Sequence, residues 1–389
     1  MTTNLSKGSY GFDVSFFLKN KINIIELKDT GSHARVIVVP DYQGRVMTST
    51  AGGNEGKSFG WINYSFIESG KRSNQFNPYG GEERLWLGPE GGPFSIYFKK
   101  DVSQEYSNWV VPKEIDTESF VVTAQFPKSV SFRKDFTLTN ASGTNMQIGI
   151  ERKVSILSRE EAEHALNLRM DDSLSFVAYE SENTLINKGN SNWTKISGAL
   201  SVWMLAMFNP SAEGVVFIPF KTGNEIELGK VVNDDYFGKV PPDRLIINDG
   251  ILFFRTDGKF RSKIGISPKR AMPICGSYDP ESQALTLLWY SAPVKPSAYV
   301  NSKWGNQVDP LDGDVVNSYN DGPVEDGSIM GPFYEIESSS PAAMLTAGGK
   351  ITHTQRIFHI TGNENKLTEV TEKLFNLSIS EINQAFNSK

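Results

Sequence analysis

The stretch Arg244-Leu-Ile-Ile-Asn-Asp-Gly-Ile-Leu-Phe-Phe-Arg-Thr256 holds two short aliphatic and aromatic runs on either side of the turn signal Asn248-Asp249-Gly250. Aliphatic β-branched and aromatic residues are enriched in strands, and Asp-Gly marks a tight turn. Similar runs, separated by clusters of Gly, Asn, Asp and Pro, recur along the chain: INIIEL (22–27), ARVIVVP (34–40), FSIYF (94–98), SFVVTAQF (119–126), NMQIGIERKVSI (145–156), VVFIPF (215–220), ALTLLWYS (284–291) and THTQRIFHI (352–360). This spacing predicts an all-β protein of antiparallel strands.

Helical signals are few. Ser158-Arg-Glu-Glu161 has the pattern of a capping box in front of a short helix. Apolar residues from Leu367 to Phe386 recur at helical spacing, which predicts a C-terminal helix packed on the sheets. The chain shows no repeat, linker or shift of composition, so we expect a single domain over residues 1–389.

The composition excludes several classes of function. The 389 residues include 39% hydrophobic side chains, enough for a sizeable core, and the net charge is −6 with no basic tract. We therefore expect no nucleic-acid partner. No apolar stretch approaches the length of a membrane span, so we expect no membrane partner either. The N-terminal residues lack the pattern of a secretory signal peptide, which favours a cytoplasmic location. The lone Cys275 lies among apolar neighbours and is interpreted as a core residue.

The first candidate site is the glycine-rich segment from Asn77 to Phe94, which contains Glu82, Glu83, Arg84 and Trp86. An arginine offers a planar fork of donors, and a tryptophan face suits the C–H surface of a sugar. The segment is therefore a candidate wall of a saccharide site. A tight hairpin with an arginine–glutamate pair and a core tryptophan has the same sequence pattern, and both interpretations stay open.

A second candidate is the expected strand around Glu335 and Glu337. Residues two apart in a strand share a face, so these carboxylates are expected side by side. Neighbouring carboxylates raise the pKa of one another, which suits a general acid or base. Two solvated glutamates on an exposed strand face would have the same spacing.

A third candidate lies in the run from Lys350 to Ile360. A regular strand places His353, Gln355 and His359 on one face. The two histidines would lie about 20 Å apart, too far to share a metal ion. His353 is a candidate acid, and the alternative is a core histidine that is hydrogen-bonded to the backbone.

The polar segment between Tyr299 and Pro323 is expected to form a binding loop. Its amides and rings suit the hydroxyl groups and the apolar face of a sugar; these residues are Asn301, Trp304, Asn317, Tyr319 and Asn320. Its carboxylates are candidate calcium ligands, namely Asp309, Asp312, Asp314 and Asp321. The segment lacks the spacing of an EF-hand, so the sugar loop is preferred and no cofactor is expected, with Ca²⁺ as the alternative.

Three segments together resemble an uncharacterised bacterial family related to the aldose 1-epimerase (galactose mutarotase-like) superfamily. They are Gly44-Arg-Val-Met-Thr-Ser with Phe59-Gly-Trp-Ile-Asn, then Gly80-Gly-Glu-Glu-Arg-Leu-Trp-Leu-Gly-Pro-Glu, and a late Glu-x-x-Ser-Pro before Gly348-Gly-Lys. The resemblance covers about residues 35 to 360, and its most specific part is Gly-Gly-Glu-Glu-Arg-x-Trp. It implies a β-supersandwich of large antiparallel sheets with a sugar-sized site on a concave face.

The resemblance also implies a function. Mutarotases interconvert sugar anomers with a glutamate base, a histidine acid and an arginine. Arg84 corresponds to the early arginine, and Glu335 or Glu337 to the late glutamate. The family carries a histidine soon after the arginine and another on a mid-chain strand, but residues 85–100 and 198–220 contain none, and His164 falls in an expected helix. The expected partner is a small saccharide or oligosaccharide. The expected function is an epimerase-like or glycoside-processing enzyme, and the alternative is a non-catalytic carbohydrate-binding protein.

Overall fold

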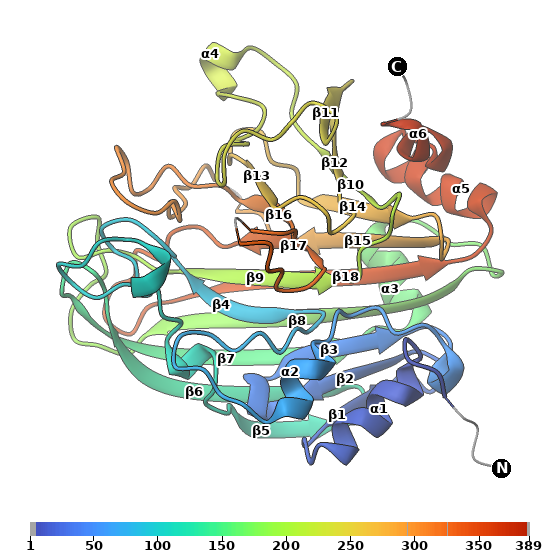
Figure 1. Ribbon diagram of the computed structural model, residues 1–389, viewed down its shortest axis with the longest axis horizontal. Coiled ribbons are helices and arrows are strands. Elements are labelled where there is room, and N and C mark those ends of the chain that lie inside the picture. Colours follow the sequence, from blue (N-terminus) through green and yellow to red (C-terminus); the bar gives the residue numbers. More distant parts are fainter. Residues whose placement is uncertain (1–4, 294, 325, 387–389) are drawn as a thin grey trace.

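Three antiparallel sheets form the framework of the molecule (Figure 1). The computed structural model describes residues 5–293, 295–324 and 326–386. The largest sheet has ten strands in the order β11 (Leu245–Asn248), β12 (Ile251–Arg255), β10 (Val215–Pro219), β14 (Ile274–Asp279), β15 (Ala284–Tyr290), β18 (Lys350–Thr361), β8 (Ser175–Asn187), β7 (Asn145–Ile156), β6 (Ser129–Thr139) and β5 (Val121–Phe126).

The second sheet carries the candidate site. Its five strands run in the order β13 (Ser262–Ile266), β16 (Val316–Asn320), β17 (Tyr334–Ser339), β9 (Ser201–Phe208) and β4 (Arg84–Gly88). A third sheet has three strands, β1 (Ile25–Lys28), β2 (Arg35–Val39) and β3 (Arg45–Thr50). All pairs within the sheets are antiparallel, as the sequence predicted.

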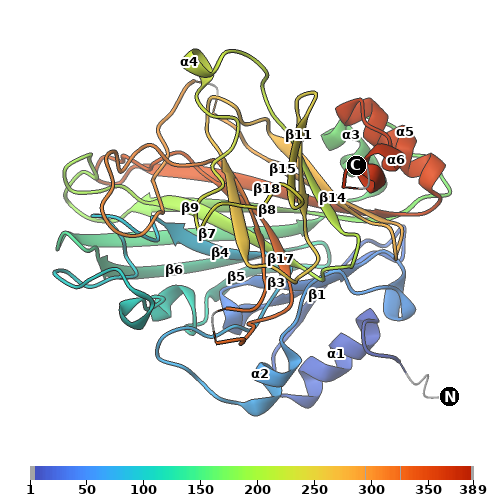
Figure 2. The ribbon, with the colours of Figure 1, turned by 45° about the horizontal axis from the view of Figure 1, so that its top comes forward.

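The helices are short and lie outside this β framework. They are α1 (Tyr10–Lys19), α2 (Tyr64–Ser69), α3 (Arg159–Leu166), α4 (Glu225–Leu228), α5 (Glu364–Phe375) and α6 (Ile379–Gln384). Figure 2 shows α1 and α2 beside the three-stranded sheet and, on another side, α3, α5 and α6 together. Apolar residues of those last three helices pack on the outward face of the ten-stranded sheet, where Phe217, Leu287 and Phe358 are buried. Within the described residues, no helix is long and apolar enough to cross a membrane.

Most of the predicted elements are confirmed, and three are wrong. The runs on either side of Asn248-Asp249-Gly250 form β11 and β12, and Ser158 makes the predicted capping box with Glu161. The single C-terminal helix is instead two helices, because Asn376 adopts a left-handed conformation and Ser378 caps a new helix. The run 94–98 forms no strand: it is an irregular segment whose Tyr97 stacks on Trp109.

The third error concerns the expected loop between Tyr299 and Pro323. Its residues Val316–Asn320 form β16, a buried strand between β13 and β17. Asparagine is depleted in strands, so the sequence favours a loop. Hydrogen bonding to both neighbouring strands and burial of the side chains override that preference.

The two larger sheets pack face to face. On β17, Tyr334 is hydrogen-bonded to Ser277 and Ser338 to His353, and both partners belong to the ten-stranded sheet. We call this side of the five-stranded sheet its inner face, and the opposite side its outer face. Because side chains alternate along a strand, neighbouring residues of β4, β9, β16 and β17 serve different faces. This alternation determines which predicted site residues can meet. The buried Cys275 lies in the core of this sandwich, as expected.

Candidate active site

The outer face of the five-stranded sheet brings together charged, amide and aromatic side chains from all five strands. The strand register sets Arg84, Leu205, Glu337 and Asn317 in one row across the sheet. The next rows add the other members. We call this group the outer-face cluster: Arg84, Trp86, Trp203, Lys263, Asn317, Tyr319, Glu335 and Glu337. All five strands, distant in sequence, are therefore needed to complete it.

Arg84 and Glu335 form a buried ion pair in the cluster. The Nη2 atom of Arg84 lies 3.0 Å from Oε1 of Glu335, and the two side chains are only 7% and 6% exposed. The guanidinium also stacks on the ring of Trp86, 4.1 Å from its centroid. Burial raises the pKa of Glu335 to about 7; the charge of Arg84 opposes this rise, and the charge of Glu337 adds to it. A carboxyl group that titrates near neutral pH suits general acid or base chemistry.

A second ion pair lies beside the first. Lys263 Nζ donates to Oε2 of Glu337 at 2.8 Å, and Trp203 Nε1 donates to the same oxygen at 2.8 Å. Burial lowers the pKa of Lys263, but the negative charges of Glu337 and Glu90 outweigh it and raise that pKa overall. Lys263 is therefore a fixed cation, and together with Trp203 it holds one oxygen of Glu337.

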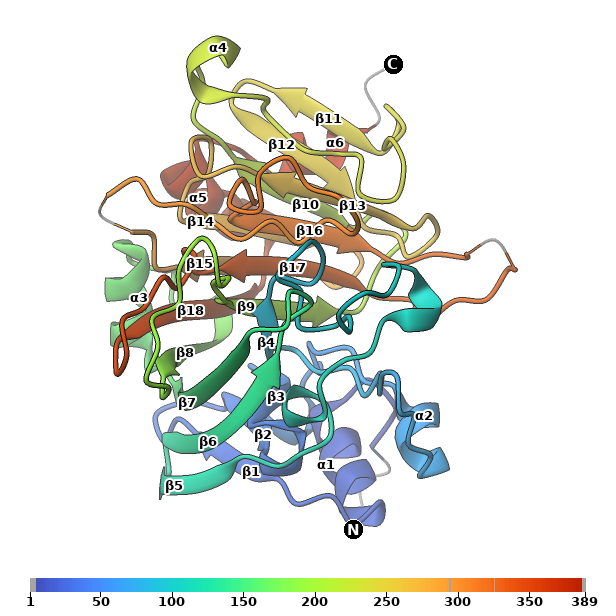
Figure 3. The ribbon, with the colours of Figure 1, turned by 90° about the vertical axis from the view of Figure 1, so that its left-hand side faces the viewer.

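The segments that cover the cluster contribute Glu90 and several rings. Trp109 packs near Trp86, and Trp304 stacks on Trp109 at 6.2 Å. Figure 3 shows the segment that follows β4, in cyan and teal, beside β4, β9 and β17. Glu90 of this segment is hydrogen-bonded to Trp304, and burial and the charge of Glu337 raise its pKa. Trp304 remains 37% exposed at the rim of this cover.

Asn317 and Tyr319 reach the cluster as expected. Asn317 Nδ2 donates to the hydroxyl of Tyr236 at 3.2 Å, and that hydroxyl donates to Asp314 at 2.5 Å. The Tyr319 hydroxyl donates to Asp321 at 2.9 Å. Both asparagine and tyrosine thus lie on the outer face, with their polar atoms held by neighbours.

The inner face holds a different network, which is fully buried. Glu83 accepts from Arg152 Nη2 at 2.7 Å, from Gln355 at 2.9 Å and from Ser181 at 3.0 Å. Glu82 lies 3.0 Å from Nε2 of His359. The side chains of Glu82, Glu83, Arg152 and His359 have no solvent exposure. These contacts join β4 and the segment before it to the ten-stranded sheet.

Several predicted site residues therefore lie away from the cluster. Glu82 and Glu83 belong to the inner network rather than to a saccharide wall. His353, the candidate acid, contacts Ser338 on the inner face at 2.8 Å, and burial lowers its pKa to about 3. It is neutral at physiological pH and lies across the sheet from Glu335. The structure thus does not bring the expected histidine to the glutamates.

Two further asparagines were also misplaced by sequence reasoning. Asn320 points to the inner side of β16, where it accepts from the amide of Gly258 and donates to the carbonyl of Phe260, both at 2.9 Å. Asn301 makes its contacts within its own loop, to Lys303 and Asp309. No hydrogen bond joins either side chain to Arg84, Glu335 or Glu337 in the described part of the chain.

The candidate calcium ligands do not converge. Asp314 accepts from Asn233 and Tyr236, Asp321 accepts from Tyr319 and from the amide of Gly331, and Asp312 is exposed. No group of three or more His, Cys, Asp or Glu side chains in the described part of the chain has the arrangement of a metal site.

Sequence reasoning missed Lys263, Trp203, Tyr236 and Glu90 as partners of the cluster. Trp203 lies in an unbroken apolar run, 202–208, which is typical of a core strand. Glu90 stood inside the glycine-rich segment but carried no distinguishing pattern. Lys263 stands between Ser262 and Ile264, in a stretch for which the sequence analysis expected no strand, so nothing in the sequence marked it.

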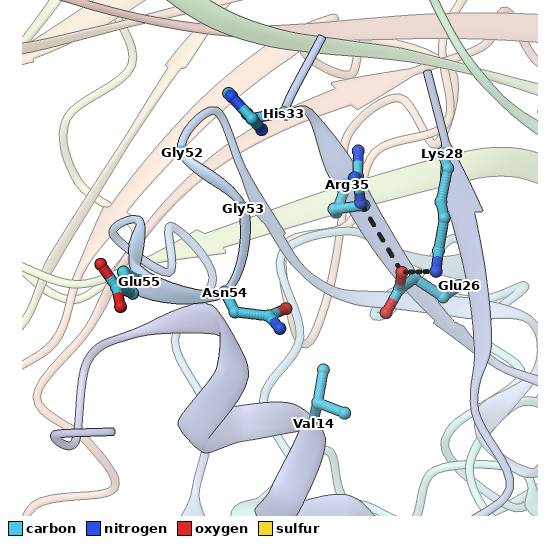
Figure 4. Close-up of a pocket in the computed structure, with 9 residues that line it drawn as sticks. All are labelled: Val14, Glu26, Lys28, His33, Arg35, Gly52, Gly53, Asn54 and Glu55. Carbon is cyan, nitrogen blue, oxygen red and sulfur yellow. Dashed lines mark ion pairs between the residues drawn. The ribbon is translucent and has the colours of Figure 1, made fainter. Parts of the chain in front are cut away.

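A surface depression of about 450 Å³ lies far from this chemistry in the fold, between α1 and the three-stranded sheet (Figure 4). Its charged residues neutralise one another: Glu26 lies 2.7 Å from Lys28 and 3.8 Å from Arg35. None of its lining residues belongs to the outer-face cluster.

A family model described as a family of unknown function, DUF6786, matches residues 8–386. The chain belongs to this DUF6786 family. A search of curated proteins finds no relative. DUF6786 thus supplies a family but no activity.

Solved structures resemble this DUF6786 member in fold. The Slr1438 protein from Synechocystis sp. PCC 6803 is 11% identical with a TM-score of 0.52, and the match covers 93% of this chain and 100% of that one. A putative aldose 1-epimerase from Escherichia coli K12 is 10% identical with a TM-score of 0.50, covering 87% and 99%. At such identities the likeness establishes the fold alone. The galactose mutarotase-like fold predicted from the sequence is therefore confirmed.

Proposed function

We propose that this protein is a carbohydrate-active enzyme that interconverts sugar anomers by proton transfer on the outer face of the five-stranded sheet. The observation that carries the proposal is the buried pair of Arg84 and Glu335, with the pKa of Glu335 near neutral. The fold of the epimerase-like neighbours supports the choice of a sugar as ligand, and the rings of Trp86 and Trp203 provide apolar surfaces for it.

In this mechanism Glu335 takes the proton from the anomeric hydroxyl group. The bond between the anomeric carbon and the ring oxygen breaks, and the ring oxygen receives a proton, which gives the open-chain aldehyde. After rotation, the hydroxyl group formed from the ring oxygen attacks the other face of the aldehyde carbon and returns its proton to the carboxylate that had donated it. Glu335 returns its proton to the aldehyde oxygen, which becomes the hydroxyl group of the second anomer. Arg84 holds the carboxylate of Glu335 in place. Glu90, whose pKa is raised, is the carboxyl group we assign to the proton delivered to the ring oxygen.

Entry of a sugar ring requires the covering segments to move, because Arg84 and Glu335 are 6% and 5% exposed. The exposed Trp304 at the rim offers a first contact for the ligand. A shielded site also strengthens the electrostatic contacts made within it.

The pH dependence tests the role of Glu335. A general base must be deprotonated to act, so the rate is expected to fall about tenfold per pH unit below pH 7 and to level off above it. Polarimetry on freshly dissolved anomers of a panel of hexoses measures this rate, with the uncatalysed rate subtracted at each pH. A profile that is flat from pH 5 to 8 would remove Glu335 from this role.

A second candidate is a non-catalytic saccharide-binding protein. The position of His353 on the inner face favours it, since the histidine acid of mutarotases has no counterpart at the cluster. Saturable sugar binding in calorimetry, without any acceleration of anomerisation over the same panel, would establish this alternative and exclude the enzyme.

A further inference from the structure

The two carboxylates and two cations of the outer-face cluster are paired, and Glu90 of the covering segment adds a third carboxyl group to the site. The carboxyl groups of Glu90, Glu335 and Glu337 face the cations of Arg84 and Lys263. Burial is the largest cause that raises the pKa of Glu90 and of Glu335, and repulsion from the carboxylate of Glu337 adds to the rise. The three carboxyl groups and two cations therefore keep one proton, which the proposed function assigns to Glu90, unless a ligand brings a further positive charge.

The surrounding groups do not correct this imbalance. Lys303 lies over the ring of Tyr236, but it is paired with Asp235 at 2.6 Å. Asp314 and Asp321, which lie behind Tyr236 and Tyr319, add more carboxylates. Arg261 lies over the ring of Phe237, 4.1 Å from its centroid. With this outer shell included, the site still lacks a positive charge whenever all three glutamates are ionised.

One carboxylate oxygen of the cluster is also unpaired. Glu337 is 1% exposed, and its Oε2 atom accepts from both Lys263 and Trp203. Its Oε1 atom is buried and has no hydrogen-bond partner among the described residues. A buried acceptor without a donor is costly, and the cost is greater for a charged group. A ligand that donates a hydrogen bond at this point would remove that cost.

The rings near Glu337 already accommodate an ammonium group. Lys263 Nζ lies 5.1 Å from the centroid of the Trp203 ring and 5.6 Å from that of Tyr236. Aromatic faces attract cations through their quadrupole. The environment of Glu337 therefore combines a free carboxylate oxygen with rings suited to a positively charged nitrogen.

From these observations we infer that the site takes an amino sugar, whose protonated amino group donates to Oε1 of Glu337, in preference to a neutral or anionic sugar. This inference rests on the proposed function, because it assumes that the cluster binds a saccharide. A hydroxyl group can donate only one hydrogen bond there, whereas an ammonium group donates three and supplies the missing charge. The carboxylate of a uronate or the phosphate of a sugar phosphate would add a further negative charge.

Isothermal titration calorimetry of the full chain at about pH 7 tests the inference, since an ordinary amino group is largely protonated there. The probes are glucosamine and galactosamine, their N-acetyl derivatives, the parent hexoses and the matching uronates. We expect the better amino sugar to bind at least about tenfold more tightly than its parent hexose and its N-acetyl derivative. The uronate is expected to bind most weakly.

Two variants test whether Glu337 is the source of the preference for the amino sugar. Glu337→Gln is expected to abolish the preference for the amino sugar, whereas Glu182→Gln, which changes an exposed carboxylate on β8, is expected to retain it. If Glu337→Gln does not fold, the comparison of amino, N-acetyl and parent sugars on the unmodified protein decides alone. Equal binding of amino and parent sugars, or tighter binding of a uronate, overturns this inference and leaves the saccharide site standing. Binding of none of the sugars overturns both.

Discussion

Replacing Arg152 by methionine is expected to lower the free energy of unfolding by about 3–5 kcal/mol. The substitution removes one partner of the ion pair with Glu83, in which both side chains are fully buried. The carboxylate of Glu83 then keeps only the neutral donors Gln355 and Ser181. The side-chain oxygen of Asn183 loses the hydrogen bond that Arg152 Nη1 donates to it. An uncompensated buried charge is the main cost. Denaturation in urea, followed by tryptophan fluorescence, measures the change.

The neighbouring Lys153 is a matched control. It lies on the same strand but on the opposite face, where its pair with Glu182 is 49% and 44% exposed. Lys153→Met is therefore expected to cost less than about 1 kcal/mol, the usual value for a surface pair. A second variant, Glu83→Gln combined with Arg152→Met, is expected to recover part of the stability because no buried charge remains. Similar losses for Arg152→Met and Lys153→Met would show that the inner network contributes little.

Replacing Glu335 by glutamine is expected to reduce the rate of anomerisation by about 10²–10⁴-fold, the usual contribution of a general base. The amide keeps the shape of the carboxyl group and offers an oxygen to Arg84, so the geometry of the pair is largely preserved. It loses the ability to take a proton near neutral pH. Polarimetry at about pH 8, where the base is deprotonated in the unmodified protein, gives the largest contrast.

Controls separate chemistry from folding. Glu182→Gln alters an exposed carboxylate that is remote from the cluster and is expected to keep the full rate. Glu335→Gln should bind sugar with an affinity within about threefold of the unmodified protein, because the substitution removes proton transfer in the transition state and not the contacts that bind the ground state. An unchanged rate in Glu335→Gln would refute the proposed base, whereas loss of both rate and sugar binding would point to a structural effect.

The sequence predicted the fold class and many strands because each strand carries its own signal. The residues 145–156 alternate, and they form β7 with the same limits. Local signals of this kind fail where contacts with distant segments determine the conformation of a stretch. The run 94–98 has a strand composition, but its rings are needed against Trp86 and Trp109, and it stays irregular. Val316–Asn320 has a loop composition and becomes a strand because β13 and β17 pair with it.

The candidate site was only partly predictable for the same reason. The shared face of Glu335 and Glu337 follows from period two within a strand, and both lie on the outer face as expected. Whether His353 of the ten-stranded sheet lies near these glutamates depends on how the two sheets stack, and no local pattern encodes this. The partners Lys263 and Trp203 come from strands about 60 residues apart, so only the completed sheet reveals that they share Glu337.

The alternation along β4 and β17 has a consequence for protein engineering. Glu83 and Arg84 are adjacent in sequence, yet one anchors the sandwich and the other belongs to the proposed site. Glu337 and Ser338 are divided in the same way. A library that randomises such a segment as a block would lose most members to unfolding before any change of specificity could be seen. Restricting diversity to every second position, with Glu83 and Ser338 held constant, would direct the search to the ligand-facing side alone.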